Sequence, residues 1–293
     1  MKVLVYGSLN IDLLYSVDHI VKPGETISST SLVKSAGGKG ANQAAALAKA
    51  GLAVYMAGKI GSDGQFILRL LESYGVNTDN VIRYDGATGQ ALIQIDKTGQ
   101  NSIVLFSGGN DAITIEEIHQ SIAQFSAGDI IVLQNEISHL KQIMESASKQ
   151  GMRICLNPSP FNENITELPL HLADWIFVNE IEGAALAQLP ESSQPEAVLK
   201  RLVQRFPGTE IILTVGKDGA LYGCDKTRAK SLIVETPVVD TTAAGDTFTG
   251  YFIAALERKM AVPQALAIAC KASSITVSRK GAMESIPNAN EVF

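Results

Sequence analysis

The most informative stretch of the sequence is Val238-Val239-Asp240-Thr241-Thr242-Ala243-Ala244-Gly245-Asp246-Thr247-Phe248. Small and polar residues follow an apolar pair, and the run 248–257 is then apolar with a helical period. The pattern predicts a short turn that opens a helix, whose free N–H groups and dipole favour an anion. Asp246 at this turn either caps the helix or acts on the anion that the turn holds.

A second glycine-rich turn lies near the start of the chain, at Ala36-Gly37-Gly38-Lys39-Gly40-Ala41-Asn42-Gln43. It opens an alanine-rich helix at 44–50, and its glycines let the backbone lie close to a ligand. A plain strand-to-helix turn is the alternative. The spacing Gly-x-x-x-x-Gly-Lys-Ser/Thr is absent, so this is not a Walker A loop.

Between these turns, apolar strands alternate with helices. Strands are predicted at 3–6, 54–60, 130–134, 153–156, 175–178 and 211–215, and helices at 65–74, 139–150 and 261–278. This alternation indicates an α/β fold, a mostly parallel sheet with helices on both faces. A hairpin is also predicted from 221–222 and 231–234.

Some early strands look different, because they alternate polar with apolar residues. The segments 9–15 and 26–34, with a hairpin formed by 91–96 and 102–106, predict a small antiparallel lid beside the main sheet.

Polar or glycine-rich clusters follow nearly every core strand. They contain Asn10, Asp12, Asn135, Glu136, Asn157, Asn179, Glu182, Gly216, Asp240 and Asp246. The carboxyl ends of parallel strands share one edge of a sheet, which is where open α/β sheets bind ligands. We therefore expect a functional crevice along this edge.

Bulk composition narrows the class of protein. The chain has 293 residues, 46% of them hydrophobic, enough for one large domain or a domain with a smaller insertion. The net charge is −6 with no run of Lys or Arg, which argues against a nucleic-acid partner. No stretch approaches the roughly 20 apolar residues of a membrane span. Three widely spaced cysteines, Cys155, Cys224 and Cys270, favour a reduced, cytoplasmic protein.

The two glycine-rich turns together resemble the two signatures of the ribokinase family of sugar kinases. The resemblance runs the length of the chain and includes Gly7-Ser8-Leu9-Asn10-Ile11-Asp12, Asn157-Pro158-Ser159-Pro160, Asn179-Glu180-Ile181-Glu182 and Arg279-Lys280-Gly281-Ala282. It implies a three-layer α/β/α fold in one domain, 1–293, with a β-sheet lid formed by about 10–36 and 88–107. It also implies a homodimer that associates through the lid.

The resemblance implies an ATP-dependent kinase that phosphorylates the primary hydroxyl of a pentose, D-ribose giving ribose 5-phosphate. Asp246 corresponds to the catalytic base, which takes the proton of the attacking hydroxyl. Ala243, Ala244 and Gly245 correspond to the anion hole. The positions that correspond to sugar contacts are Asn10, Asp12, Gly38, Lys39, Asn42 and Glu136, and Asp246 also touches the sugar.

The remaining family positions concern the nucleotide and the metal ions. Asn179 and Glu182 correspond to the residues that order Mg²⁺ and phosphate, and Thr214, Gly216 and Gly219 to the nucleotide side. A monovalent cation site, occupied by K⁺ in the family, corresponds to Asp240, Thr242, Thr276, Arg279, Gly281 and Ser285. The late-helix position near the adenine, often His or Asn in the family, is Cys270 here.

Simpler interpretations stay open for several of these residues. Asp12 fits the wet face of a strand, Lys39 a surface turn, and Asp240 a turn without an ion. Glu136 fits a helix cap and Glu182 a solvated first-turn glutamate. None of the four histidines is assigned a role.

Two other functions also stay open. One is a kinase of the same family that acts on a nucleoside or another sugar. The other is a sugar-binding regulator without catalysis, against which the intact Asp246 argues.

Overall fold

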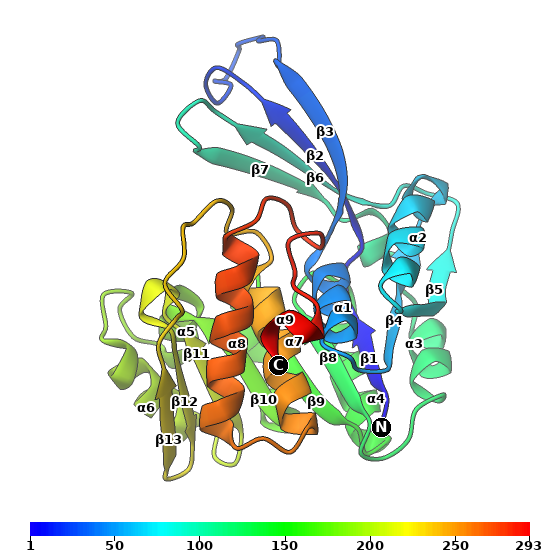
Figure 1. The fold of residues 1–293 in the computed structure, drawn as a ribbon. Helices are drawn as coiled ribbons and strands as arrows, with labels where there is room; N and C mark the ends of the chain where they lie inside the picture. The colour runs from blue at the N-terminus through cyan, green and yellow to red at the C-terminus, as the bar shows by residue number, and fades with distance from the viewer.

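The computed structural model describes residues 1–293, and its core is a nine-stranded sheet. The strands are β1 (Val3–Tyr6), β4 (Val54–Ile60), β5 (Asn77–Arg83), β8 (Ile130–Gln134), β9 (Arg153–Asn157), β10 (Trp175–Asn179), β11 (Glu210–Thr214), β12 (Ala220–Cys224) and β13 (Thr227–Ser231). Their spatial order is β13-β12-β11-β10-β9-β8-β1-β4-β5 (Figure 1). All neighbours are parallel except at β12 and β13, as the pattern of apolar strands predicted.

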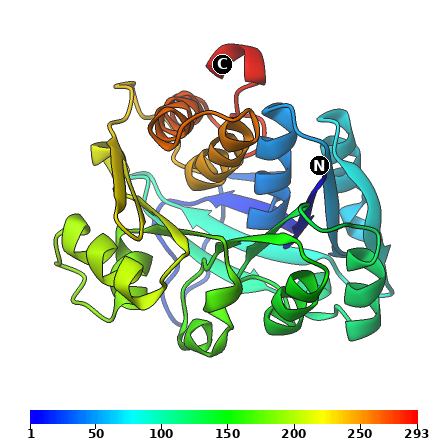
Figure 2. The same cartoon turned by 90° about the horizontal axis from the view of Figure 1, so that it is seen from below.

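Helices cover both faces of this sheet, so the fold is the predicted three-layer α/β/α arrangement (Figure 2). One face carries α1 (Lys39–Lys49), α2 (Gln65–Ser73), α7 (Ala244–Glu257) and α8 (Val262–Val277), and the short α9 (Ala289–Val292) contacts α8. The other face carries α3 (Ile115–Ile122), α4 (Leu140–Lys149), α5 (Glu180–Ala187) and α6 (Pro195–Arg205). None of the helices is both long and apolar enough to span a bilayer.

Strand β1 shows why the sequence folds into layers. Val3 and Val5 pack with the α1–α7 side, whereas Leu4 and Tyr6 pack with the α3–α4 side, and all four are at most 1% exposed. A strand buried on both faces needs a continuous apolar run, because successive side chains point to opposite faces. This strand also lies where the chain reverses direction across the sheet, between β4 and β8. Open α/β sheets bind ligands beside such a reversal.

A second sheet projects from the carboxyl edge of the main sheet and forms the lid (Figure 1). It contains β2 (Asn10–Ser16), β3 (Ser31–Gly37), β6 (Gly89–Ile95) and β7 (Asn101–Phe106), in the order β3-β2-β6-β7. The prediction of a purely antiparallel lid was wrong, because β2 and β6 run parallel. The expected strand at 26–34 is also displaced, since β3 begins only at Ser31.

Two glycines at the base of the lid leave room for polar side chains. A Cβ added to Gly37 would lie 2.0 Å from a carboxylate oxygen of Asp12, and one added to Gly89 would lie 2.3 Å from the amide oxygen of Asn10. Side chains there would displace Asp12 and Asn10, so these glycines allow both residues to face the space under the lid.

The sequence prediction missed β5, α3, α6 and α9, and it gave no bounds for α5. Strand β5 lies at the edge of the sheet, and its sequence Asn-Thr-Asp-Asn-Val-Ile-Arg has too few apolar residues to indicate a buried strand. The expected strand at 231–234 is wrong, because β13 ends at Ser231 and residues 232–243 form no regular element. Val238 and Val239 in this segment are 67% and 61% exposed.

Candidate active site

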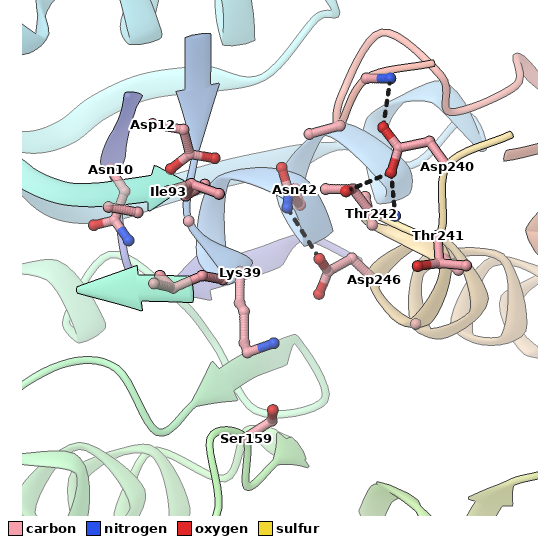
Figure 3. Close-up of a pocket in the computed structure, with 18 of the residues that line it drawn as sticks. Asn10, Asp12, Lys39, Asn42, Ile93, Ser159, Asp240, Thr241, Thr242 and Asp246 are labelled. Atoms are coloured by element: carbon pink, nitrogen blue, oxygen red, sulfur yellow. Dashed lines mark hydrogen bonds between the residues drawn. The ribbon is translucent and has the colours of Figure 1, made fainter. Parts of the chain in front are cut away.

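A cleft of about 1270 Å³ separates the carboxyl edge of the main sheet from the lid. The start of α7, the start of α1, the ends of β10 and β11, and the inner face of the lid all contribute to its wall. Figure 3 shows that Asn10 and Asp12 of β2, Lys39 and Asn42 of α1, and Asp246 of α7 come together here. The predicted crevice therefore exists at the predicted edge.

The start of α7 forms an open anion pocket. Ala243, the residue before the helix, has the left-handed backbone angles φ 60° and ψ 9°, which a residue with a side chain adopts only at a cost. The N–H of Ala244 donates to the Thr241 carbonyl oxygen at 3.3 Å, whereas those of Gly245 and Asp246 make no hydrogen bond. A Cβ added to Gly245 would meet no atom within 4 Å, so a ligand can approach the backbone closely.

Asp246 lies in this first turn, but its carboxylate does not cap the helix. The side chain instead reaches α1, where Oδ2 accepts a hydrogen bond from Asn42 Nδ2 at 3.1 Å and Oδ1 accepts one from Gln43 Nε2 at 2.9 Å. Burial raises the pKa of this carboxyl, and the charge of Lys39 and the two amide donors act against that rise. The interpretation as a simple cap is therefore wrong.

Lys39 supplies a positive charge beside three carboxylates. Burial disfavours its charged form, but Asp246, Glu136 and Glu182 together outweigh burial and raise the pKa of the ammonium group. The lysine therefore stays protonated at neutral pH. Its position in the cleft wall contradicts the alternative of a lysine in a surface turn.

Glu136 follows β8 and is tied to the glycine-rich turn. Its Oε2 accepts hydrogen bonds from Ser8 Oγ and, at 3.1 Å, from the backbone N–H of Lys39. Ser8 Oγ in turn accepts the N–H of Gly40 at 3.2 Å. Glu136 does not cap α4, whose first turn follows His139, so the alternative interpretation as a cap is wrong.

Asp12 faces the cleft from the inner side of the lid. Burial, together with the negative charge of Glu136, raises the pKa of its carboxyl to about 7. It thus titrates near neutral pH, unlike an ordinary residue on the wet face of a strand.

Three further predicted sugar positions lie around it. Asn10 Oδ1 accepts a hydrogen bond from Asn110 Nδ2 at 2.7 Å, which leaves the Asn10 N–H donors for a ligand. Asn42 lines the cleft and donates from Nδ2 to Asp246, while its Oδ1 is buried without a partner. Gly38, with φ 93°, lines the cleft, and a Cβ there would lie 2.8 Å from the Ser8 carbonyl oxygen.

Asn179 and Glu182 stand on the other side of the cleft, at the start of α5. They form a capping box in which Asn179 Oδ1 accepts the N–H of Glu182 at 2.8 Å and Glu182 Oε2 accepts the N–H of Asn179 at 3.1 Å. Both residues also line the cleft, and so does Thr214. Glu182 is therefore a glutamate of the first helical turn, with Oε2 used in the capping box. It also lines the cleft.

Gly216 and Gly219 shape the turn between β11 and β12 and do not line the cleft. Their φ angles are 51° and 93°, and a Cβ on Gly219 would lie 2.0 Å from the carbonyl oxygen of Ser231. These glycines allow the tight turn.

The loop before α7 is ordered by Asp240. Its Oδ1 accepts the N–H of Thr242 at 2.9 Å and the Thr242 hydroxyl at 2.6 Å, and Oδ2 accepts the N–H of Gly281 at 3.1 Å (Figure 3). Burial would raise the pKa of Asp240, but these hydrogen bonds outweigh it and hold the pKa below its usual range. Asp240 is therefore ionised in the wall of the cleft.

The other predicted cation-site side chains turn away from the cleft. Thr276 is buried and donates to Thr247 Oγ1 at 3.0 Å, Ser285 donates to the Ala282 carbonyl at 2.7 Å, and Arg279 pairs with Glu291. Any contribution of these three residues to an ion site would come from their backbone.

The sequence reasoning missed several polar residues that hold the site. Ser8, Gln43, Asn110 and Gln134 are all buried and hydrogen bonded to predicted site residues or their neighbours. Gln134 ends the apolar strand Ile130–Leu133, and a glutamine in that position was the available signal.

Comparisons with known proteins agree with this geometry. A family model described as pfkB family carbohydrate kinase matches residues 1–289. The ribokinase of Haemophilus influenzae is 36% identical, covering 99% of this chain and 96% of that protein. The deoxyribokinase of Salmonella typhi is 31% identical, covering 98% of this chain and 96% of that protein. The structure of Arabidopsis thaliana ribokinase complexed with ribose and ATP superposes with a TM-score of 0.88 at 30% identity, covering 99% of this chain and 97% of that one.

The chain therefore belongs to the pfkB family of carbohydrate kinases. It is a ribokinase-like phosphotransferase that uses ATP, as the resemblance of its two glycine-rich turns implied.

Proposed function

We propose that this kinase transfers the γ-phosphoryl group of ATP to the primary hydroxyl of a pentose, converting D-ribose to ribose 5-phosphate. One observation carries the proposal. The buried carboxylate of Asp246 stands between the free N–H groups at the start of α7 and a set of polar side chains that suits a polyol. The names of the relatives, mostly ribokinases, support the choice of sugar.

In the proposed reaction, Asp246 is the catalytic base. Its carboxylate takes the proton of the sugar hydroxyl while the hydroxyl oxygen attacks the γ-phosphorus. The bond from that phosphorus to the bridging oxygen breaks, and ADP leaves with the electron pair. The backbone N–H groups at the Ala243–Gly245 turn, of which that of Gly245 is unpaired, stabilise the charge on the phosphoryl oxygens during transfer. Lys39 adds positive charge on the sugar side.

The sugar is held by groups that accept and donate hydrogen bonds. Asp12 and Glu136 accept from hydroxyl groups and the Asn10 amide donates, with Asn42 beside them in the same cleft. The remaining predicted contacts, at Gly38 and Lys39, lie at the base of the same pocket.

We place the nucleotide on the side of α5 and β11, where its phosphates point at α7. Thr214 faces this space, and Gly216 and Gly219 shape the neighbouring turn. The carboxylate and amide of Glu182 and Asn179 suit a hydrated Mg²⁺, which neutralises phosphate charge when bound.

A monovalent cation, K⁺, fits beside the ionised Asp240 in the loop before α7. The site also includes Thr242 and Gly281, and Thr276, Arg279 and Ser285 contribute only through their backbone.

We further propose that residues 1–293 act as one domain whose lid, 10–36 and 88–107, closes over the sugar. The outer face of this lid exposes Leu32, Val104 and Phe106 by 54%, 63% and 57%. Such a patch favours association, and we propose a homodimer through the lid. ATP and the three free cysteines fit a cytoplasmic enzyme.

A nucleoside is the second candidate substrate, because the inner face of the lid is apolar. Leu14, Ile93 and Ile103 line the cleft and present a wall on which a base could stack. The third candidate is a sugar-binding regulator without catalysis. The arrangement of Asp246 and the α7 turn argues against it.

A substrate panel tests the proposal directly. ADP formation is followed with D-ribose, 2-deoxy-D-ribose, D-fructose, adenosine and inosine, with and without K⁺. We expect the highest kcat/KM with D-ribose and a higher rate with K⁺. A higher kcat/KM with a nucleoside than with D-ribose would favour the second candidate, a nucleoside kinase. No ADP formation with any of the sugars or nucleosides would leave only the regulator.

A further inference from the structure

Behind the proposed base lies a chain of buried amide side chains that reaches the central sheet. Gln134, the last residue of β8, donates from Nε2 to Gln43 Oε1 at 2.7 Å. Gln43 on α1 then donates from Nε2 to Asp246 Oδ1 at 2.9 Å. Both glutamines are 0% exposed, so neither can exchange its partner for bulk water. Neither belongs to the sugar, nucleotide or ion positions assigned above.

The orientation of the Gln43 amide is fixed from two sides. Asn157 donates from Nδ2 to the carbonyl oxygen of Phe177 at 2.9 Å, so its Oδ1 is the atom that faces Gln43, at 3.3 Å from Nε2. Asp246 Oδ1 is the second acceptor that requires this NH₂ group, and Gln134, whose own Oε1 has no partner, donates the N–H that the carbonyl oxygen of Gln43 accepts. Both neighbours therefore turn the NH₂ group of Gln43 toward Asp246.

This orientation determines the environment of the base. An amide turned the other way would place a carbonyl oxygen against the Asp246 carboxylate, which would favour the protonated acid. As the chain stands, Asp246 receives one N–H from Gln43 and one from Asn42, and both favour the ionised form that a base needs. The two bonds also hold both carboxylate oxygens in a fixed position.

The fold leaves space for the Gln134 side chain but does not satisfy all of its polar atoms. A Cβ on Gly7 would lie 2.0 Å from Gln134 Oε1, so the glycine at the end of β1 leaves space for this side chain. Gln134 Oε1 is nevertheless buried and has no hydrogen-bond partner. An apolar side chain of the same length would avoid that loss, so stability alone does not account for a glutamine here.

We propose that Gln134 is a positioning residue for the catalytic base, acting through Gln43. It supplies the donor for the carbonyl oxygen of Gln43 and so stabilises the orientation in which the Gln43 N–H groups face Asp246, which keeps Asp246 ionised and aimed at the acceptor hydroxyl. The inference rests on the proposed function in one respect, the assignment of Asp246 as the base.

The variants Gln134→Met and Gln43→Met test it, because methionine keeps the length and removes the amide. We expect Gln134→Met to lower kcat about 10-fold and to shift the acid limb of the kcat–pH profile upward by about 0.5–1 pH unit. Gln43→Met should shift it by about 1–2 units. KM for the sugar should change less than about threefold in both. Gln124→Met, which removes an amide that bonds Asn80 far from the cleft, is the control.

The double variant separates action through Gln43 from an independent effect. If Gln134 acts only through Gln43, Gln43→Met/Gln134→Met should match Gln43→Met alone. Additive losses, or an acid limb in Gln134→Met identical to that of the unmodified enzyme, would overturn the proposal.

A measurement without turnover keeps this result apart from the substrate assignment. The Asp246 carboxyl is titrated by ¹³C NMR in protein labelled at aspartate, with Asp246→Asn identifying its signal. A higher pKa in Gln134→Met supports the positioning role even if the substrate panel fails, and an unchanged pKa contradicts it. Thermal melting confirms that each variant is folded.

Discussion

The two walls of the cleft are built in opposite ways. On the side of the main sheet, Asp246, Asn42 and Gln43 are buried and joined by hydrogen bonds of 2.9–3.1 Å between α1 and α7. On the lid side, the strands expose apolar residues on the outer face and present Leu14 and Ile93 on the inner one. The first wall holds the polar side chains of the proposed catalytic group in place, whereas the second covers the cleft. We infer that substitutions in the first should lower kcat, and that substitutions in the lid should act on sugar binding and association.

Removing the charge of the base should give the largest effect. Asp246→Asn keeps the size of the side chain but cannot take the proton of the hydroxyl, so we expect kcat to fall about 10³-fold or more. The affinity for the sugar, measured by isothermal titration calorimetry, should stay within about threefold. Asp79→Asn, on the exposed edge strand β5, is the matched control. Substantial turnover in the Asp246→Asn enzyme would contradict the assignment of Asp246 as the catalytic base.

Filling the anion pocket should come next. Gly245→Val places a branched side chain in a space where no protein atom lies within 4 Å of the added Cβ. We expect kcat to fall about 10²-fold or more, because the phosphoryl group loses its backbone donors. The melting temperature should not fall, since valine replaces glycine within a helix. Unchanged activity would mean that the phosphates bind elsewhere.

A lid residue that faces the sugar should act mainly on KM. Asp12→Asn removes a charged acceptor, and we expect KM for ribose to rise about 10-fold or more, with kcat changed by less than about threefold. Burial and Glu136 raise the pKa of Asp12 to about 7, so the unmodified enzyme gains its ionised acceptor as pH rises through that value.

The KM for ribose of the unmodified enzyme should accordingly fall between pH 6 and pH 8. In Asp12→Asn this dependence should disappear, because the asparagine does not titrate. A persistent slope in the variant would assign the dependence to another group.

The outer face of the lid should give the smallest effect on chemistry. Val104→Lys places a charge on the exposed apolar patch and should shift a dimer toward monomer in sedimentation velocity, with kcat within about threefold. Val104→Ile keeps the patch apolar and serves as the control. Sedimentation of the unmodified protein as a monomer at all concentrations would contradict the proposed dimer.

The same contrast governs what the sequence could predict. The layered fold followed from continuous apolar strands such as Ile130–Leu133, because burial on both faces leaves a clear signal. The site followed from polar residues at strand ends and from glycines such as Gly38 that allow close approach. These features are local in the chain.

Features that depend on distant partners could not be predicted. The parallel pairing of β2 with β6 is decided by neighbours far apart in sequence, and polar alternation alone does not reveal direction. The role of Gln43 depends on Gln134, 91 positions away, and on Asn157.

If Asp246 activates the primary hydroxyl of a pentose, a sugar without that hydroxyl should bind but not react. D-Ribose and 5-deoxy-D-ribose, which lacks the hydroxyl, are compared in one assay of ADP formation and phosphorylated product. We expect ribose 5-phosphate from the first sugar, and from the second no phosphorylated product but competitive inhibition. A phosphorylated product from 5-deoxy-D-ribose would contradict this role of Asp246.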